Sequence, residues 1–369
     1  MKKILIAAAV VGAFSGAAQA QTNVTLYGIA DVGMRWDRTT AGSYTSMTGG
    51  EMAGSRWGLR GSEDLGGGLK ANFMIEAGFN VDAGTTVSAA APVAIFNRTS
   101  YAGLSGNWGN FRLGNDYSPY FNTWSKLDPF GGASISAMGT KAVPGGASSS
   151  LVLPSYSAGA YVGGATRMTN TIFYDTPEFS GFRVLGAYKF GEAVPTAAGV
   201  PPADKALGNA YSLAGIYANG PIFAGIANYQ AKTAVGITKK DLVWGGSYDF
   251  RVAKVALQVF TEKDNTAGAG QRNTRSTELG VTVPVGALIV KASYARYDDR
   301  NALTNADATA TNLGVDYVMS KRTTLYGRWA RIHNNANAAM GLSGGMLGTG
   351  TIGLGSSPSA ITAGINHKF

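Results

Sequence analysis

The side chains best able to carry chemistry in this 369-residue chain are single arginines set among small and apolar residues. A guanidinium group stays protonated and offers a fixed fan of donors, so several on one wall can attract and pass anions. Alternation places Arg56, Arg60, Arg98 and Arg112 on the polar face of extended segments, and Arg167 follows the longest irregular segment. These five are the candidate basic site, unless some of them simply pair with acids such as Asp31, Glu76 or Asp116.

A long segment between two extended runs, residues 117–165, is the natural partner of these arginines. It carries Lys126, Asp128 and Lys141, and a segment of this length is unusual unless it has a function. Five of its aromatic residues could pack it against a wall, and they are Tyr117, Tyr120, Phe121, Trp124 and Phe130. We therefore expect it to line the same site, the alternative being a loop exposed outside the molecule.

Residues for bond chemistry are scarce. The chain has two histidines, His333 and His367, and no cysteine. Acid–base or nucleophilic catalysis usually needs a histidine held beside a carboxylate or a hydroxyl, and neither histidine has such a neighbour in a recognisable motif. The cluster Gly66-Gly67-Gly68 precedes no predicted helix, so it indicates a turn and not a phosphate site. We predict no enzyme activity, no metal and no cofactor.

Hydrophobic residues recur with period two, which is typical of strands with two unlike faces. Val24, Leu26 and Trp36 alternate with Thr25, Tyr27 and Arg35, which places Arg35 near the outer rim on the polar face. Leu313, Val315 and Tyr317 alternate with Asn312, Gly314 and Asp316 in the same way. Each run is about ten residues wide, which suits a tilted strand that crosses a bilayer.

The connections between these runs alternate between tight and long. The seven tight turns are 63–68, 106–109, 177–181, 219–221, 250–251, 284–286 and 320–322. The eight long loops are 37–51, 80–93, 117–165, 191–208, 231–240, 264–273, 300–309 and 333–357. Short periplasmic turns opposite long extracellular loops are typical of outer-membrane barrels, and this count predicts sixteen antiparallel strands.

A closed barrel satisfies every backbone group inside hydrocarbon while only one face of each strand is apolar. This agrees with a mean hydropathy of +0.01 and only 14% charged residues. Aromatic residues near strand ends suit interfacial girdles, and they are Trp36, Trp57, Tyr101, Phe111, Tyr188, Tyr217 and Trp329. The basic residues form no run, so we expect no nucleic-acid partner.

Both chain ends carry further signals. Residues 1–20 have the form of a cleaved signal peptide, with Lys2 and Lys3, an apolar stretch from Ile4 to Phe14, and Ala18-Gln19-Ala20. Residues 21–369 then form one barrel domain, whose 29 basic and 22 acidic residues give a net charge of +7. At the other end a strand with alternating polarity stops on Phe369, the terminal aromatic residue that barrel-assembly machinery reads.

Several segments resemble the general trimeric porins of β-proteobacteria, of the neisserial and Burkholderia type. They are Val24–Gly28 (VTLYG), Ser55–Gly68 (SRWGLRGSEDLGGG), Tyr174–Phe182 (YDTPEFSGF) and the closing His367-Lys368-Phe369. The resemblance covers residues 21–369 in order. It implies a homotrimer of sixteen-stranded barrels in which the third loop, 117–165, folds inward and faces arginines such as Arg56 and Arg98. Members of the family often have a basic residue where this chain has Phe173.

The expected function is an outer-membrane diffusion channel for small hydrophilic solutes and ions. Its selectivity would come from pore width and lining charge, and one loop acid facing several arginines predicts a preference for anions. The alternatives are a substrate-specific channel, for example for sugars, and a plugged structural barrel. The expected partners are outer-membrane lipid, lipopolysaccharide, periplasmic chaperones and the assembly machinery.

Overall fold

The computed structural model describes residues 23–40, 42–86, 94–133, 166–192, 204–268, 271–342 and 352–369, and the backbone of 141–142 and 149–150. The predicted signal peptide, residues 1–20, lies outside the described residues. No helix in the described ranges is long and apolar enough to cross a membrane, a finding that does not bear on strands.

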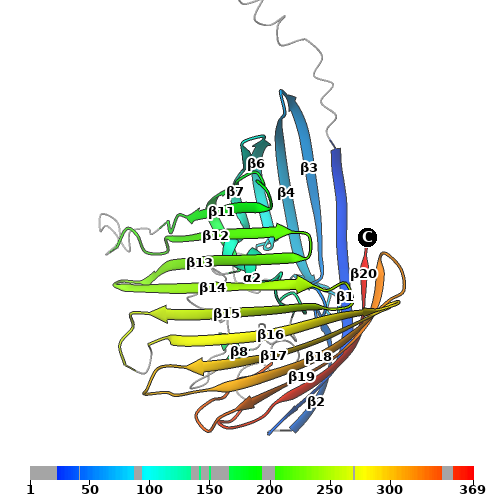
Figure 1. The fold of residues 1–369 in the computed structure, drawn as a ribbon, viewed down its shortest axis with the longest axis vertical. Coiled ribbons are helices and arrows are strands. Elements are labelled where there is room, and N and C mark those ends of the chain that lie inside the picture. The colour runs from blue at the N-terminus through cyan, green and yellow to red at the C-terminus, as the bar shows by residue number, and fades with distance from the viewer. Residues whose placement is uncertain are drawn as a thin grey trace, which may run out of the picture.

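The described chain is almost entirely a single antiparallel sheet that closes on itself. Eighteen strands belong to this sheet, and two of them, β2 (Gly42–Gly49) and β5 (Thr85–Thr86), are hairpin additions within loops, which leaves sixteen in the ring. Each ring strand pairs with the next one along the chain, and β1 pairs with β20, as the adjacent blue and red strands in Figure 1 show. The predicted sixteen-stranded barrel is confirmed.

The ring strands are β1 (Asn23–Thr39), β3 (Arg56–Gly66), β4 (Leu69–Asn80), β6 (Thr99–Gly106), β7 (Gly109–Tyr117), β10 (Arg167–Asp175), β11 (Phe182–Lys189), β12 (Ala210–Asn219), β13 (Ile222–Ala234), β14 (Ile237–Asp249), β15 (Lys254–Asp264), β16 (Asn273–Val285), β17 (Leu288–Asp299), β18 (Ala308–Val318), β19 (Thr323–Asn334) and β20 (Ser359–Lys368). Between β7 and β10 lie a short helix, α2 (Pro119–Trp124), and the two-residue strands β8 (Lys141–Ala142) and β9 (Ser149–Ser150).

Burial follows the predicted alternation. In β18, Asn312 and Asp316 are buried, whereas Leu313 and Tyr317 are 50% and 47% exposed. A soluble protein would bury the second pair and expose the first. Apolar side chains that face outward and polar side chains that face inward fit hydrocarbon outside the ring and water inside it. The girdle prediction is wrong for Tyr101, which lies under the Arg112 guanidinium on the inner side.

One predicted loop is a tight turn. Residues 231–240 were expected to be irregular, but β13 continues to Ala234 and β14 begins at Ile237, so only Val235 and Gly236 connect them. The first loop also contains more strand than expected, because β1 extends to Thr39 and pairs with β2. Where a strand projects beyond the membrane, its outer face no longer needs apolar residues. The alternation of apolar and polar residues then disappears, and the sequence of the strand resembles that of a loop.

The seam between the first and last strands is closed by the chain's final residue. The Phe369 amide donates to the Gly28 carbonyl over 3.1 Å, and the Gly28 amide donates to the Phe369 carbonyl over 3.0 Å. The Phe369 ring lies directly over Gly28, where a Cβ atom would collide with it. A terminal aromatic residue is therefore part of the closure itself.

Candidate functional site

The loop after β7 begins with a short helix that lies inside the barrel. Ser118 caps α2 by accepting a hydrogen bond from the Phe121 amide, and Pro119 occupies the first turn, where its missing amide is harmless. Tyr120 and Trp124 are buried, and the Tyr120 amide donates to Ser212 Oγ on β12. The Trp124 ring meets Phe260 of β15 edge-on, 6.2 Å between centroids. The inner wall therefore holds the start of the loop.

Beyond the helix the loop follows a track of inward-facing glycines. A Cβ atom on Gly225 would lie 2.6 Å from Thr123, one on Gly245 would lie 2.8 Å from Leu127, and one on Gly314 would lie 2.7 Å from Phe130. On Gly280 it would collide with the Pro129 ring. These glycines belong to β13, β14, β18 and β16, so residues 123–130 cover the inner wall from β13 to β18. Only a wall without side chains allows so close an approach.

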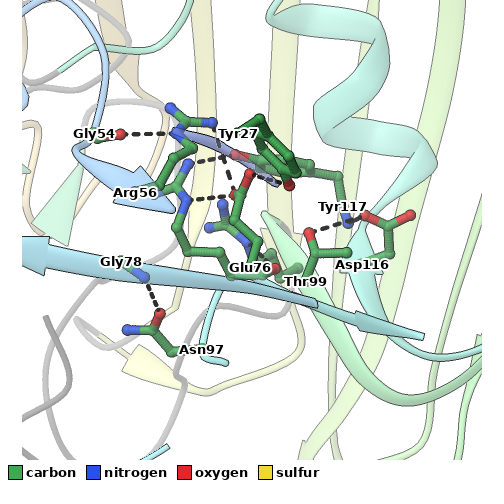
Figure 2. A network of polar contacts seen from close by, with 11 residues as sticks. Tyr27, Gly54, Arg56, Glu76, Gly78, Asn97, Thr99, Asp116 and Tyr117 are labelled. Carbon is green, nitrogen blue, oxygen red and sulfur yellow. Dashed lines mark hydrogen bonds and ion pairs between the residues drawn. The ribbon is translucent and has the colours of Figure 1, made fainter. Parts of the chain in front are cut away.

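Two of the predicted arginines meet at one carboxylate on the other side of the barrel (Figure 2). Arg98 Nε donates to Glu76 Oε1 over 2.7 Å, and Arg56 Nη1 lies 3.8 Å from the same oxygen. The second oxygen, Oε2, accepts a hydrogen bond from the Tyr27 hydroxyl over 3.0 Å. Arg56 is further fixed by donation from its Nε to the Gly54 carbonyl. Glu76 is 3% exposed, whereas both guanidinium-bearing side chains retain access to solvent.

Arg167 joins the same group through Tyr117. Its Nε donates to the Arg98 carbonyl over 2.6 Å, and its guanidinium lies 4.1 Å from the centre of the Tyr117 ring. Arg98 Nη2 donates to the Tyr117 hydroxyl over 2.9 Å. Tyr117 also stacks on Phe121 of α2, so the arginine group and the loop share one anchor. We call Arg56, Arg98 and Arg167 the arginine cluster.

Arg60 and Arg112 lie on the inner wall outside this cluster. Arg60 stands over the Tyr27 ring at 5.3 Å. Arg112 Nη1 donates to Asp175 Oδ2 over 3.0 Å, and Arg112 Nε lies 3.5 Å from Asp116. Its guanidinium also packs on the ring of Phe173, 5.5 Å from the ring centre. Two carboxylates surround Arg112, so its charge is largely compensated.

Arg35 is enclosed and not open to the lumen. Its side chain is fully buried, with Nε 2.8 Å from Asp37 and Nη1 3.0 Å from Glu51. Glu51 lies in the loop between β2 and β3, where burial raises the pKa of its carboxyl group despite the Arg35 charge. Arg35 was predicted to be a charge near the outer rim of the pore. It instead forms an ion cluster with Asp37 and Glu51, which holds the first loop against the barrel wall.

The three predicted charges of the third loop, Lys126, Asp128 and Lys141, also differ in their surroundings. Asp128 accepts hydrogen bonds from the Phe130 and Gly132 amides, so its carboxylate shapes the turn of the loop. Lys126 stands 5.6 Å from the centre of the Phe223 ring, and its carbonyl accepts from Lys254 Nζ over 3.4 Å. Burial, then repulsion from Arg183 and Lys254, lowers the pKa of Lys126. The side chain of Lys141 lies outside the described residues.

Sequence reasoning missed two cations that lie near Lys126, namely Arg183 and Lys254. A cavity of about 300 Å³ lies between the loop and the wall, lined by Lys126, Lys254 and Lys291 among others. The Lys291 charge is offset by Asp316 at 3.0 Å. The alternation of β15 could have placed Lys254 on the inner wall. Its contact with Lys126, 128 residues earlier in the chain, could not be predicted because it depends on the path of the third loop. Within the described ranges, no group of three or more acidic or histidine side chains could hold a metal ion.

A closed ring with a charged inner wall and an apolar outer wall defines an outer-membrane β-barrel channel protein. The sequence profile of a family described as Gram-negative porin matches residues 7–337. The chain belongs to this family, and it is an outer-membrane porin and not an enzyme.

Relatives support this over the full length. Outer membrane porin protein 32 of Delftia acidovorans is 35% identical and covers 100% of both chains. An outer membrane porin protein of Bordetella pertussis is 32% identical over 88% of this chain and 93% of its own. Among solved structures, the anion-selective porin from Comamonas acidovorans matches with a TM-score of 0.79 and 32% identity, covering 94% of this chain and 100% of that one. OmpF of Salmonella typhi, 14% identical with a TM-score of 0.61, shares the fold.

Proposed function

We propose that this porin is a general diffusion channel for small hydrophilic solutes that prefers anions at its constriction. The observation that carries the proposal is the composition of the arginine cluster. Arg98 and Arg167 both contact Tyr117, and Arg56 and Arg98 share the single carboxylate of Glu76. The nearby Asp116 lies 3.5 Å from Arg112 and accepts a hydrogen bond from Thr99 Oγ1. Its negative charge therefore mainly compensates Arg112 and not the arginine cluster.

The position of the cluster supports the same proposal. Residues 123–130 occupy the wall from β13 to β18, whereas Arg56 and Glu76 lie on β3 and β4. Ions that pass between loop and wall would meet an excess of positive charge, which raises the local concentration of anions. The solved relative from Comamonas acidovorans is described as anion-selective, and at 32% identity it favours the same preference here. The inward third loop, including Lys141, would complete the constriction.

The deciding experiment is a reversal-potential measurement in a salt gradient across planar bilayers. A unit charge about 5 Å away contributes about 0.8 kcal/mol in water, which is a factor of about four in local anion concentration before screening. We expect Arg56→Ser and Arg98→Ser each to lower the anion-to-cation permeability ratio by about two- to fourfold. Arg322→Ser, at the exposed turn after β18, removes the same charge and should leave the ratio unchanged. A wild type that favours cations would refute the proposal.

The same preparation separates a general pore from a substrate-specific one. Liposomes that contain the protein should swell in sugars and amino acids at rates that fall smoothly with solute size. Saturation of the rate by one solute class would indicate a specific channel, and a lack of conductance would indicate a plugged barrel.

We further propose that the working form is a homotrimer of single-domain barrels that start at Gln21 after removal of residues 1–20. The support is the resemblance of the motifs quoted above to trimeric porins. Mass spectrometry of the native protein extracted from membranes should give three copies of a chain without its first twenty residues. A monomer, or a chain that keeps Lys2 and Lys3, would contradict this.

A further inference from the structure

A second group of cations lies inside the barrel, apart from the arginine cluster. Lys126 of the third loop holds its amine 5.6 Å from the centre of the Phe223 ring, near the start of β13. Lys254, the first residue of β15, donates from Nζ to the Lys126 carbonyl over 3.4 Å. Arg183, the second residue of β11, is close enough to repel the Lys126 charge. We call Lys126, Arg183 and Lys254 the periplasmic basic group.

The alternation of the strands points both wall cations of this group into the lumen. Lys254 has the phase of Ala256, which is buried on the inner wall, whereas Leu257 between inward positions is exposed to lipid. Arg183 has the phase of the buried Leu185. Side chains from two separate parts of the wall therefore converge on the loop residue Lys126.

The periplasmic basic group and the arginine cluster lie at different heights in the pore. Arg56 and Arg167 are the first residues of β3 and β10, and both strands begin at long loops. Arg183 and Lys254 lie at the starts of strands that follow short turns. Because long loops are extracellular and short turns are periplasmic in such barrels, a solute from outside meets the arginine cluster first and this group second.

The group borders a cavity of about 300 Å³ between the third loop and the wall. Three neighbouring strands present a row of donors to this cavity, because Thr282 of β16 is the direct cross-strand partner of both Lys254 of β15 and Lys291 of β17. Lys126 lines the same cavity from the loop side. Ligand pockets in proteins range from about 300 to about 1,000 Å³, so this one suits a small solute.

Acidic side chains compensate the periplasmic basic group only in part. Among the described residues, Asp128 is the one carboxylate that lines the cavity, and it accepts hydrogen bonds from two amides of its own loop. Asp249 is the cross-strand partner of Lys254 but forms no ion pair with it. Asp316 pairs with Lys291 at 3.0 Å. The three bases of the group form no ion pair in the described ranges, so an excess of positive charge remains beside the cavity.

These donors suit a phosphate group better than a carboxylate. A lysine amine is a compact point charge with three donors, whereas the planar fork of an arginine matches the plane of a carboxylate. A phosphate group presents oxygens in several directions, so the loop and the wall can each bind some of them. A phosphate monoester also carries about −1.5 to −2 charges at neutral pH, which strengthens its attraction to several cations.

We propose that the periplasmic basic group binds the phosphate group of small solutes, as free phosphate or as a phosphate monoester. Lys126 holds the phosphate from the loop, Lys254 and Thr282 hold it from the wall, and Arg183 adds its charge. The site rests on the proposed diffusion function, because the solute reaches it through the pore. It differs from the arginine cluster in that it retains doubly charged phosphates, whereas chloride passes without such binding.

Block of the chloride current in planar bilayers tests this site. Inorganic phosphate, glycerol 3-phosphate and succinate are added separately at constant chloride concentration and ionic strength, at about pH 8, where the phosphates are mostly dianions. We expect both phosphates to lower the single-channel chloride current, with a dependence on concentration that saturates. Succinate has the same two charges on planar carboxylates, and it should need an at least about threefold higher concentration for the same block.

Lysine variants test which side chains bind the phosphate. Lys126→Gln and Lys254→Gln should each raise the half-blocking concentration of both phosphates about four- to sixteenfold, because a dianion doubles the energy of interaction with each lost charge. Lys70→Gln is the matched control. Lys70 is the second residue of β4, so it lies at a similar height on the opposite side of the ring and has the inward phase of Glu76. Its replacement should leave the block unchanged.

The reversal potential of the same wild-type channels separates this site from the proposed function. Anion preference without block by either phosphate would overturn the phosphate site alone, whereas cation preference would refute the anion preference of the constriction. Equal half-blocking concentrations in the wild type and both lysine variants, or for phosphate and succinate, would also overturn the site. Stronger block by glycerol 3-phosphate than by inorganic phosphate would identify phosphorylated solutes as the ligand, and the reverse order would identify free phosphate.

Discussion

At the scale of single residues, Glu76 limits how positive the pore wall can be. Its carboxylate interacts with Arg98 at 2.7 Å and Arg56 at 3.8 Å, and it accepts from Tyr27. Glu76→Gln keeps the shape and removes the negative charge, so the net charge of the arginine cluster with residue 76 rises from +2 to +3. We expect the anion-to-cation permeability ratio to rise by about two- to fourfold in reversal-potential measurements. Glu63→Gln, beside the turn after β3, is the matched control, and an unchanged ratio in Glu76→Gln would separate the cluster from the conduction path.

Lys126 should make selectivity depend on pH. Burial and the nearby Arg183 and Lys254 charges lower the pKa of its amine, so it loses its proton at a lower pH than an ordinary lysine. The positive charge is present below that pKa and is lost above it, and the anion preference should therefore weaken as pH rises from 7 towards 10. Lys126→Arg keeps its charge across this range and should flatten the profile. A wild type and variant with identical profiles would contradict this role.

The sequence predicts which residues face inward better than it predicts their partners. Phase alone places Arg56, Arg60 and Arg112 on the inner wall, because a period of two needs only local residues. Compensation of Arg112 by Asp175 depends on the pairing of β7 with β10 across the third loop, 63 residues apart. The register of that strand pair cannot be predicted from residues that are neighbours in the sequence.

At the scale of elements, strands were predictable wherever one face meets lipid and the other meets water. The alternation fails above the membrane, where β13 and β14 continue to Ala234 and from Ile237 with polar residues on both faces. The path of the third loop was equally hidden. Its aromatic residues predict packing, but the receiving surface consists of glycines on four separate strands, each unremarkable in its own sequence context.

That track gives an element-scale prediction. In Gly280→Ala the new methyl group would meet the Pro129 ring, which must move away from the wall and into the lumen. We expect a lower single-channel conductance and a loss of about 1–3 kcal/mol of stability, the usual range for overpacking. Gly215→Ala is the matched control, since its Cβ atom would have its nearest neighbour at 3.8 Å. Equal conductance in wild type and Gly280→Ala would mean that the loop does not limit ion flow.

At the scale of the whole molecule, a barrel is stable only if its ends meet, and Asp31 lies where they do. Its carboxylate accepts from the Gly50, Glu51 and Ala53 amides of the first loop at 3.1 Å each. It also accepts from the Tyr326 hydroxyl of β19 at 2.9 Å and from Asn366 Nδ2 of β20 at 2.8 Å. One buried anion thus joins the first strand, the first loop and the last two strands.

Asp31→Asn should weaken this closure more than any exposed carboxylate change. Oδ1 receives Gly50, Glu51 and Tyr326, and Oδ2 receives Ala53 and Asn366, so an amide nitrogen placed at Oδ2 leaves two donors unsatisfied. Each buried donor left without an acceptor costs about 1–3 kcal/mol, which gives a loss of about 2–6 kcal/mol. The temperature of the folded-to-unfolded gel shift should fall accordingly. Asp64→Asn, which affects only an exposed contact to the Gly66 amide, should leave that temperature unchanged. If both variants unfold at the same temperature as the wild type, closure of the barrel depends on backbone pairing between β1 and β20 alone.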